Sequence, residues 1–281
     1  MTRDERMAKI RGTRWIRYAR AEQIGAKLDE LLRLPKTHRM PNLLIVAETN
    51  NGKTALISHF VHQHPAQLSA PRTISRIPVM AVQAPPVPDE RRFYQAILTL
   101  AYAPFRPSHN VAQLQSEALR LLATLKVRLL IIDEIHHLLG GPLLRQRSFL
   151  NVIKYLGNEL QIPIVAAGTD DAFNAIQTDP QLANRFEPMV LPRWTMNEEY
   201  LRLLASFEVA LPLAEPSGLL EPALATKILT LSGGTIGEIS ALLCRAALLA
   251  IERGSERITD TLLDACGYVP PAQRRRGALS R

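Results

Sequence analysis

Short apolar runs alternate with amphipathic stretches over the first two thirds of the chain. The runs show no apolar/polar alternation, which is typical of strands buried on both faces of a parallel sheet. They predict strands over residues 42–47, 77–83, 128–133, 162–168 and 187–194. Helical spacing predicts helices over 21–33, from Lys53 onward, after the N-cap Asp89, over 111–125 and around 146–159. The pattern predicts an α/β fold, with a parallel five-stranded sheet sandwiched by helices.

The chain after Trp194 carries only helical signals, over residues 197–211, 221–232, 235–253 and 258–267. Thr235 and Glu238 match a T-x-x-E capping box, and Gly254 is placed to end the third of these helices. We therefore expect four parts. They are a basic N-terminal segment with a helix (1–40), an α/β domain (41–195), a small all-helical lid domain (196–270) and a basic tail (271–281).

Composition narrows the class of protein. The 281 residues are 47% apolar, which suits a globular chain with a sizeable core. No apolar run approaches the roughly 18 residues of a membrane span, so no membrane partner is expected. The start, MTRDERMAKIRGTRW, does not resemble a secretory signal. Cys244 and Cys266 lie in apolar helical patterns and are expected to be reduced, which indicates the cytoplasm.

The net charge of +8 is concentrated at the two ends of the chain. Residues 1–40 hold 11 Lys and Arg against 5 Asp and Glu, and residues 272–281 hold four Arg and no acid. Basic ends on a nearly neutral body indicate a polyanion partner, most simply nucleic acid. A solubilising surface with a frayed tail is the alternative interpretation.

The stretch AETNNGKT, residues 47–54, resembles a phosphate-binding P-loop, G-x-x-x-x-G-K-[ST], with Ala47 in place of the first Gly. It follows a predicted strand and opens a helix, where backbone N–H groups favour phosphate. Gly52 allows close backbone approach, Lys53 would neutralise phosphate charge, and the Thr54 hydroxyl would hold Mg²⁺. The candidate nucleotide-binding residues are Glu48, Thr49, Asn50, Asn51, Gly52, Lys53 and Thr54. A chance turn before a helix is the alternative.

A second signal follows about 80 residues later, where the strand RLLIID ends in Asp133 and is followed by Glu134. Asp133 suits a Mg²⁺ contact, and Glu134 suits the general base that activates the attacking water. Two acids that cap the next helix would be the structural alternative. GKT and DE in this order predict a nucleoside triphosphatase, and the lack of N-K-x-D in the sequence disfavours GTP.

Three further positions bear on this chemistry. Thr169 ends the fourth predicted strand, where a polar side chain would sense the γ-phosphate. Arg185, in LANRF, precedes the fifth strand and would act as an arginine finger on a neighbouring subunit's nucleotide. A surface salt bridge is the alternative for Arg185. His136 and His137 are adjacent on a helix, so we expect them to point apart and to form no shared metal site.

These residues make the chain resemble the AAA+ ATPases, and among them the TniB/TnsC-type transposition regulators, TniB most closely. The resemblance rests on RMPNLLIVAETNNGKT, LLIIDEIHHLL, IVAAGTDDAF, DPQLANRFEPMVLPRW and LSGGTIGEI, and extends over roughly residues 12–267. It implies ATP and Mg²⁺ as cofactors and rings or helical filaments on double-stranded DNA. It also implies that the protein connects a DDE-type transposase to its target site.

The resemblance also assigns roles. Lys53 and Thr54 become the Walker A residues, Asp133 and Glu134 the Walker B pair, and Thr169 sensor 1. Arg185 becomes the finger supplied in trans. Trp15 and Tyr18 lie in the N-terminal segment that often packs beside the base, with plain core packing as the alternative.

Two departures from the family pattern stand out. Ala47 replaces a Walker A glycine, and Gly237 stands where many AAA+ proteins have the sensor 2 arginine. Without that cation we expect slow, regulatory hydrolysis, in which ATP mainly holds an assembled state. Arg257 or another lid residue would be the compensation.

DNA contacts are harder to locate from the sequence. Candidates are Arg91, Arg92, Arg145 and Arg147, and the tail residues 274–276. Repeated once per subunit, such contacts would sum to strong, salt-sensitive binding with little sequence preference. Other functions remain open at this point: another AAA+ nucleic-acid factor such as a replication initiator or helicase loader, a small-molecule phosphotransferase, and a scaffold that binds ATP without cleaving it.

Overall fold

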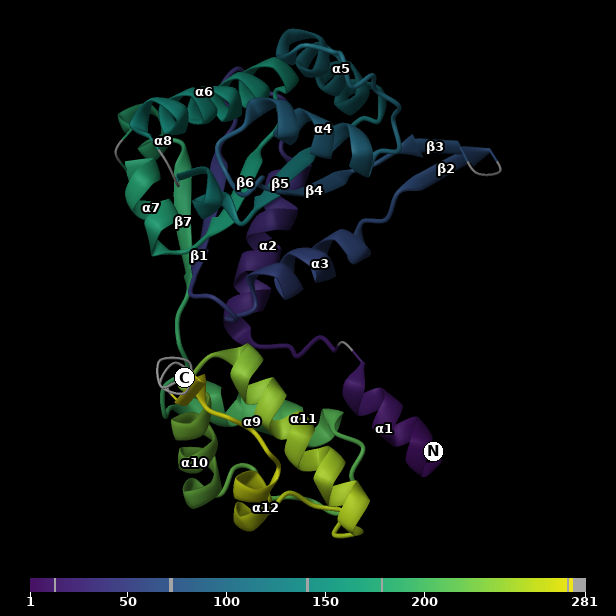
Figure 1. The fold of residues 1–281 in the computed structure, drawn as a ribbon, viewed down its shortest axis with the longest axis vertical. Helices are drawn as coiled ribbons and strands as arrows, with labels where there is room; N and C mark the ends of the chain where they lie inside the picture. The colour runs from purple at the N-terminus through teal and green to yellow at the C-terminus, as the bar shows by residue number, and fades with distance from the viewer. Residues whose placement is uncertain (13, 71–72, 140–141, 178, 272, 275–281) are drawn as a thin grey trace. The chain divides into compact units, whose positions relative to one another are not determined.

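The structure is a computed structural model that describes residues 1–281 except 13, 71–72, 140–141, 178, 272 and 275–281 (Figure 1). The described chain forms two compact units. The α/β unit contains Gln23–Thr49 and Lys53–Leu191, and the helical unit contains Met1–Glu22, Asn50–Gly52 and Pro192–Arg281. Of the tail arginines, Arg275 and Arg276 lie outside the described residues.

The α/β unit is built on a parallel sheet, as the apolar runs predict. Its strands are β1 (Asn42–Ala47), β4 (Val79–Gln83), β5 (Leu129–Asp133), β6 (Ile164–Gly168) and β7 (Phe186–Leu191), in the order β4-β5-β6-β1-β7. Every residue of β1, β5 and β6 is buried. A strand flanked by strands and covered by helices has no solvent face, which is why these three strands are apolar except for Asn42 and Asp133 at their ends.

Helices flank this sheet (Figure 1). They are α3 (Lys53–Gln63), α4 (Glu90–Leu100), α5 (Val111–Thr124), α6 (Leu143–Leu160), α7 (Asp170–Gln177) and α8 (Pro180–Ala183). Helix α2 (Ala19–Arg33) begins in the helical unit and ends in the α/β unit. Asp89 caps α4 as predicted, because its side chain accepts a hydrogen bond from Arg92 N at 3.0 Å.

Several short elements have no counterpart among the predicted ones. They are the antiparallel hairpin β2 (Gln67–Ala70) and β3 (Thr73–Arg76), the 3₁₀ helix η1 (Ile135–Leu139), and helices α7 and α8. Four to eight residues give too few turns or alternations for a hydrophobic period to emerge.

The helical unit contains α9 (Glu198–Ala210), α10 (Pro222–Ser232), α11 (Ile236–Arg253) and α12 (Asp260–Ala265) around a core of its own. Helix α1 (Arg3–Arg11) packs on α11, with Ile10 buried and Arg6 paired to Glu256 at 2.6 Å. The sequence did carry a signal for α1, a capping box of Thr2 and Glu5, which the structure contains. Within the described residues no single helix has the length and apolarity to cross a membrane, and α10 and α11 reach it only as a pair bent by 117°.

The predicted capping box at the start of α11 is wrong. Thr235 is the N-cap residue, but its side chain makes no cap hydrogen bond, and its Oγ1 is buried without a partner among the described residues. Glu238 does not reach back to Thr235, because its carboxylate accepts hydrogen bonds from Asn50, Tyr268 and Arg274. Gly254 ends α11 as predicted, in the left-handed conformation with φ 72°.

Gly168, the last residue of β6, permits a close approach of η1 to the sheet. A Cβ there would lie 2.6 Å from Ala172 Cβ and 3.0 Å from Ile135 Cγ2. Both neighbours are fully or almost fully buried, so neither can move into solvent. A side chain at this position would therefore push η1 or α7 away from β6.

We expect Gly168→Ala to lower the free energy of unfolding by about 1–3 kcal/mol, because overpacking a filled core has that cost. The matched control is Gly25→Ala: Gly25 lies inside α2, where an added Cβ meets nothing within 4 Å. Alanine there should stabilise by up to ~1 kcal/mol. Urea unfolding followed by circular dichroism measures both changes. A midpoint for Gly168→Ala equal to that of the unmodified protein would contradict the close approach.

Candidate nucleotide site

The candidate site lies at the carboxyl edge of the parallel sheet, where the strands of an α/β fold present their loops to ligands. Strand β6 lies between β1 and β5, so the ends of these three strands are neighbours. Lys53 and Thr54 come from the loop and helix after β1, Asp133 ends β5, and Thr169 follows β6. The topology thus gathers, at one edge, residues up to 116 positions apart in the printed sequence.

Thr54 and Asp133 meet directly. The Thr54 hydroxyl donates a hydrogen bond to Asp133 Oδ2 at 2.8 Å, and the Asp133 side chain is largely buried. The Lys53 ammonium donates to the backbone carbonyls of Ala47 at 2.7 Å and Glu48 at 3.0 Å. These carbonyls end β1, so they hold the Lys53 side chain against the strand from which the loop departs.

Electrostatics also connect the lysine with both acids. Burial lowers the pKa of Lys53 below its ordinary value, while the negative charges of Glu134 and Asp133 act in the opposite direction. Lys53 is only 4% exposed, which matters because a buried ammonium needs anionic partners. A polyanion such as a phosphate chain would supply the same compensation.

Glu134 has a strained backbone, with φ 55° in the left-handed region. Non-glycine residues held there cost about 1–3 kcal/mol and cluster at functional sites. The Glu134 amide donates to Asp133 Oδ1 at 2.8 Å, which closes the turn. The Glu134 carboxylate then lies 3.1 Å from His136 Nε2.

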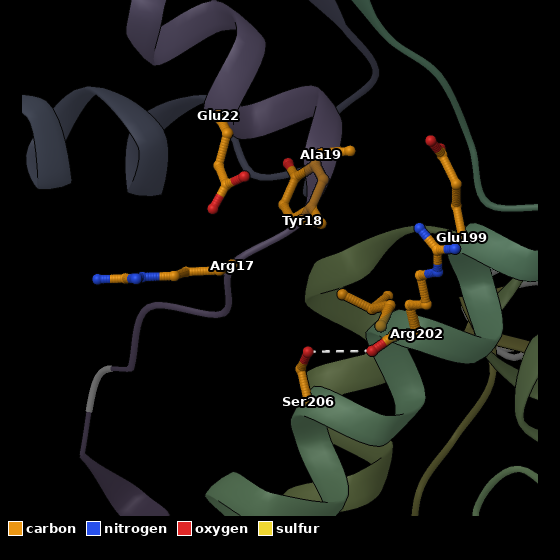
Figure 2. Close-up of a pocket in the computed structure, with 8 residues that line it drawn as sticks. Arg17, Tyr18, Ala19, Glu22, Glu199, Arg202 and Ser206 are labelled. Atoms are coloured by element: carbon orange, nitrogen blue, oxygen red, sulfur yellow. Dashed lines mark hydrogen bonds between the residues drawn. The ribbon is translucent and has the colours of Figure 1, made fainter.

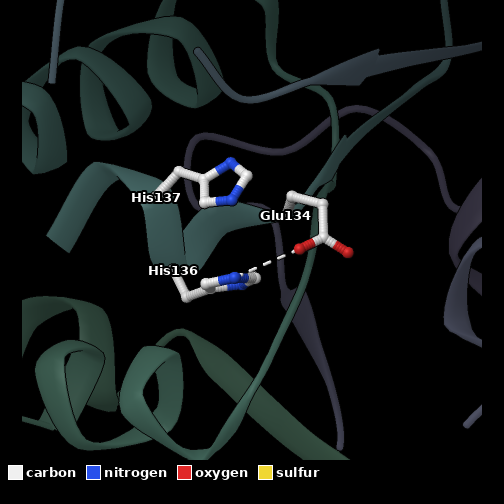
Figure 3. A group of neighbouring side chains, drawn as sticks. All are labelled: Glu134, His136 and His137. Carbon is white, nitrogen blue, oxygen red and sulfur yellow. Dashed lines mark ion pairs between the residues drawn. The ribbon is translucent and has the colours of Figure 1, made fainter. Parts of the chain in front are cut away.

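His136 and His137 do not point apart, contrary to the expectation from helical spacing. Their ring centroids are 4.6 Å apart, and Figure 3 shows both rings with the Glu134 carboxylate in one group. Helical spacing fixes only the directions of the two Cα–Cβ bonds, whereas rotation about the side-chain torsions brings the rings together. Burial lowers the pKa of His136 below its ordinary value, against the opposing effect of Glu134.

Thr169 and Arg185 differ in their placement. The Thr169 hydroxyl oxygen is buried without a hydrogen-bond partner among the described residues, which leaves it available to a ligand. Arg185 lies at the opposite edge of the sheet, because its carbonyl accepts from the amide of Asn42 at the amino end of β1. Its Nη1 donates to Asn158 at 2.8 Å. Arg185 therefore does not join Lys53 and Thr54 within its own chain.

The tip of the P-loop belongs to the helical unit. The Asn50 carbonyl accepts from Gly237 N at 3.0 Å, and Asn50 Nδ2 donates to Glu238 at 2.9 Å. Asn51 Nδ2 donates to the Pro192 carbonyl at 3.0 Å. A Cβ on Gly237 would lie only 2.0 Å from Asn50 Oδ1. The contact between the loop tip and α11 therefore requires glycine at the position where an arginine would serve as sensor 2.

Gly52 has φ 88°, which only glycine adopts readily, so the second glycine of the loop pattern is explained by its backbone. The backbone at position 47 does not require glycine, because Ala47 is an ordinary buried residue at the end of β1.

Glu238 is a residue whose role the sequence pattern concealed. Its carboxylate accepts two hydrogen bonds from Arg274, at 3.0 and 2.7 Å, one from Tyr268 at 2.6 Å and one from Asn50. Burial raises the pKa of the Glu238 carboxyl, but these donors outweigh it and lower the pKa overall. The first arginine of the tail is thus connected, through one carboxylate, to the tip of the P-loop.

Tyr18 lines a pocket of about 250 Å³ within the helical unit, together with Arg17, Glu22, Glu199, Arg202 and Ser206 (Figure 2). Its ring packs edge-on against Trp194, with centroids 5.2 Å apart. Burial raises the pKa of Tyr18 to about 12. The Tyr18 hydroxyl also lies near Gly52, because a Cβ added at Gly52 would be 3.7 Å from it. Trp15 is half-buried and does not line the pocket.

The four arginines proposed to contact DNA lie on two helices that begin side by side. The Ser148 hydroxyl of α6 donates to Glu90 of α4 at 2.5 Å, and the Phe93 and Phe149 rings lie 5.1 Å apart. Arg92, Arg145 and Arg147 are exposed there. Arg91 is half-buried, and its guanidinium donates to the Pro107 carbonyl.

Several solved structures share this fold. Orc1 of Aeropyrum pernix in complex with DNA has a TM-score of 0.63 at 20% identity, covering 88% of this chain and 63% of that one. Cdc6p of Pyrobaculum aerophilum has a TM-score of 0.63 at 16% identity, covering 89% and 67%. The Orc2 protein of A. pernix, in ADPNP–ADP complexes, has a TM-score of 0.64 at 15% identity, covering 92% and 70%. At these identities the likeness concerns the fold alone.

The sequence itself assigns the family. No curated protein matches the chain significantly. A family model described as "Bacterial TniB protein" matches residues 6–196, which is more than half of the chain and includes the P-loop, Asp133, Glu134 and Arg185. The chain therefore belongs to the TniB family and has the fold of the AAA+ ATPases.

Proposed function

We propose that this protein is an ATP-dependent regulator of transposition in the bacterial cytoplasm. It assembles on double-stranded DNA, marks the target site, and recruits and activates a DDE-type transposase. The observation that carries the proposal is the meeting of Lys53, Thr54 and Asp133 at one sheet edge in a chain of the TniB family. DNA association is further supported by the solved structures of similar fold, one of which is bound to DNA.

The residues present fit Mg²⁺ and a nucleotide. The Thr54 hydroxyl and the Asp133 carboxylate lie 2.8 Å apart and are both hard oxygen donors, which Mg²⁺ prefers. Mg²⁺ would neutralise phosphate charge there. Lys53 would exchange its carbonyl partners for phosphate oxygens, Thr169 would donate its unpaired hydroxyl, and residues 48–52 would provide backbone amides. Glu134 would orient the attacking water and accept its proton.

Tyr18 and the pocket beside it are our candidate for the adenine side of the nucleotide. The aromatic ring and the nearby Gly52 support this assignment. Trp15 is a weaker candidate for an adenine contact, because it does not line the pocket.

Arg185 supports self-assembly. It is partly exposed at the sheet edge opposite the Walker residues of its own chain, so it can serve only the nucleotide of another copy. In a ring or filament each protomer would then complete its neighbour's site. Gly237 supports slow hydrolysis, because the lid position that would carry a sensor 2 cation is taken up by the contact with Asn50.

The face formed by the starts of α4 and α6 is our candidate DNA surface. Arg92, Arg145 and Arg147 provide its exposed cations, and repeated copies would contact successive phosphates. Phosphate contacts do not read bases, so little sequence preference is expected. Another AAA+ nucleic-acid factor, such as a replication initiator or helicase loader, is the alternative, and the Orc1 and Cdc6p likeness favours it only through the shared fold.

Electron microscopy of the full chain with two unrelated DNA duplexes tests this proposal. We expect ordered oligomers on both duplexes with Mg²⁺ and a non-hydrolysable ATP analogue, and none without nucleotide. In parallel, Arg145→Ala with Arg147→Ala should weaken DNA binding and make it less salt-dependent, by about 0.9 in log–log slope per lost phosphate contact. The control pair Arg245→Ala with Arg253→Ala removes two exposed cations from α11 in the helical unit. Nucleotide-independent assembly, or preference for one duplex, would contradict the proposal.

Mixing two inactive variants tests the role of Arg185. Glu134→Gln and Arg185→Ala should each lower ATP turnover at least roughly 100-fold, as losses of a general base and an arginine finger do. In an equimolar mixture, an Arg185→Ala chain keeps its Glu134 and receives Arg185 from a Glu134→Gln neighbour, so turnover should partly return.

The control for this mixture pairs Arg185→Ala with a chain carrying both substitutions, which should stay inactive. If the first mixture co-assembles and yet gains no activity, Arg185 does not act between protomers.

A further inference from the structure

The segment after β5 gathers three potential metal ligands that the nucleotide site does not all use. Glu134, His136 and His137 each offer one ligand atom, and these atoms lie within 4.8 Å of one another (Figure 3). We propose that Glu134, His136 and His137 form a binding site for a transition-metal ion, with Zn²⁺ as the best fit. This site is separate from the Mg²⁺ position at Thr54 and Asp133.

The donor set determines the class of ion. Two imidazoles and one carboxylate suit Zn²⁺ and similar borderline ions, whereas Mg²⁺ demands oxygen donors in octahedral geometry. Three protein ligands leave a fourth position of a tetrahedral Zn²⁺ site to water. The site would therefore discriminate against the ion that accompanies ATP.

The geometry is close to what Zn²⁺ requires. Ligands about 2.0–2.1 Å from a tetrahedral ion lie roughly 3.4 Å from one another. His136 Nε2 and Glu134 Oε2 are already 3.1 Å apart. No two of the three ligand atoms lie more than 4.8 Å apart, so closure by at most about 1.4 Å completes the site. Rotation of the half-buried His137 ring provides a movement of that size.

A second observation points to a ligand at this position. The Nδ1 atoms of His136 and His137 are both buried, and neither has a hydrogen-bond partner among the described residues. A buried polar atom left without a partner costs free energy, so two such atoms in adjacent rings call for an explanation. A metal ion that binds His136 through Nε2, the atom near Glu134, and His137 through Nδ1 would give the second of these two buried atoms a strong partner.

The support for this site is rigid. Glu134 is fixed by its left-handed turn and by the hydrogen bond from its amide to Asp133, and η1 lies tightly against Gly168 at the end of β6. Because the backbone on both sides of the cluster is held, only side-chain movement is needed for binding. Preorganisation of this kind reduces the entropic cost of binding.

The consequence for turnover rests on the proposed function of Glu134. A carboxylate that coordinates Zn²⁺ is not free to accept a proton from water. Zn²⁺ is therefore expected to inhibit ATP hydrolysis while nucleotide binding through Lys53 and Thr54 persists.

The test measures Zn²⁺ binding to the full chain without nucleotide, in excess Mg²⁺, by competition with a chromophoric chelator. The expected result is one Zn²⁺ per chain. His136→Ala and His137→Ala should each weaken its affinity at least roughly 10-fold, by analogy with the losses that altered metal sites show. The control His38→Ala removes an exposed histidine elsewhere in the α/β unit and should leave affinity unchanged. Circular dichroism melting checks that each variant is folded.

Zn²⁺ affinity equal in the protein and in both cluster variants would overturn the site. Binding that depends on both histidines but leaves ATP turnover unchanged would overturn the inhibitory consequence. Since binding is measured without nucleotide, these outcomes stay distinct from failure of the ATPase assignment, which Glu134→Gln tests separately.

Discussion

The hydrogen bond between Thr54 and Asp133 is the constraint on which the rest of the site depends. It joins the first turn of α3 to the end of β5 across 79 residues of sequence. Hydrogen bonds to charged groups contribute about 1.5–3 kcal/mol, enough to fix the relative positions of two loops. The two oxygens that this bond brings together are also those that would hold Mg²⁺, so local stability and ligand binding use the same atoms.

The P-loop is divided between the two units. Asn50, Asn51 and Gly52 belong with the helical unit, and Lys53 begins the first helix after the loop in the α/β unit. Glu238 holds the tip and is itself held by Arg274, so the basic tail reaches the loop through two side-chain contacts. Position 237 requires glycine because a Cβ there would clash with Asn50. Glycine also means that this position offers no cationic side chain to a phosphate. Both facts support the slow, regulatory hydrolysis that we propose.

Long apolar patterns predicted the sheet and the longer helices well. Strands β1, β5 and β6 are buried on every residue, and burial coincides with hydrophobicity there except at Asn42 and Asp133. The pairing of Thr54 with Asp133 followed from motif order and the parallel topology. Contacts decided by side-chain torsions could not be predicted: the two histidine rings converge despite their adjacent positions. The position of Glu238 fits a capping box, but its carboxylate accepts hydrogen bonds from Tyr268 and Arg274 instead.

Thr54→Val keeps the shape of the side chain and removes its hydroxyl, so the Mg²⁺ dependence of its ATP binding tests most directly whether Thr54 and Asp133 hold Mg²⁺. Titration calorimetry with a non-hydrolysable analogue, with Mg²⁺ and with a chelator, measures it, and Thr99→Val on the exposed part of α4 is the control. We expect Mg²⁺ to strengthen binding to the unmodified protein and the control but not to Thr54→Val. Equal Mg²⁺ enhancement in all three would contradict it.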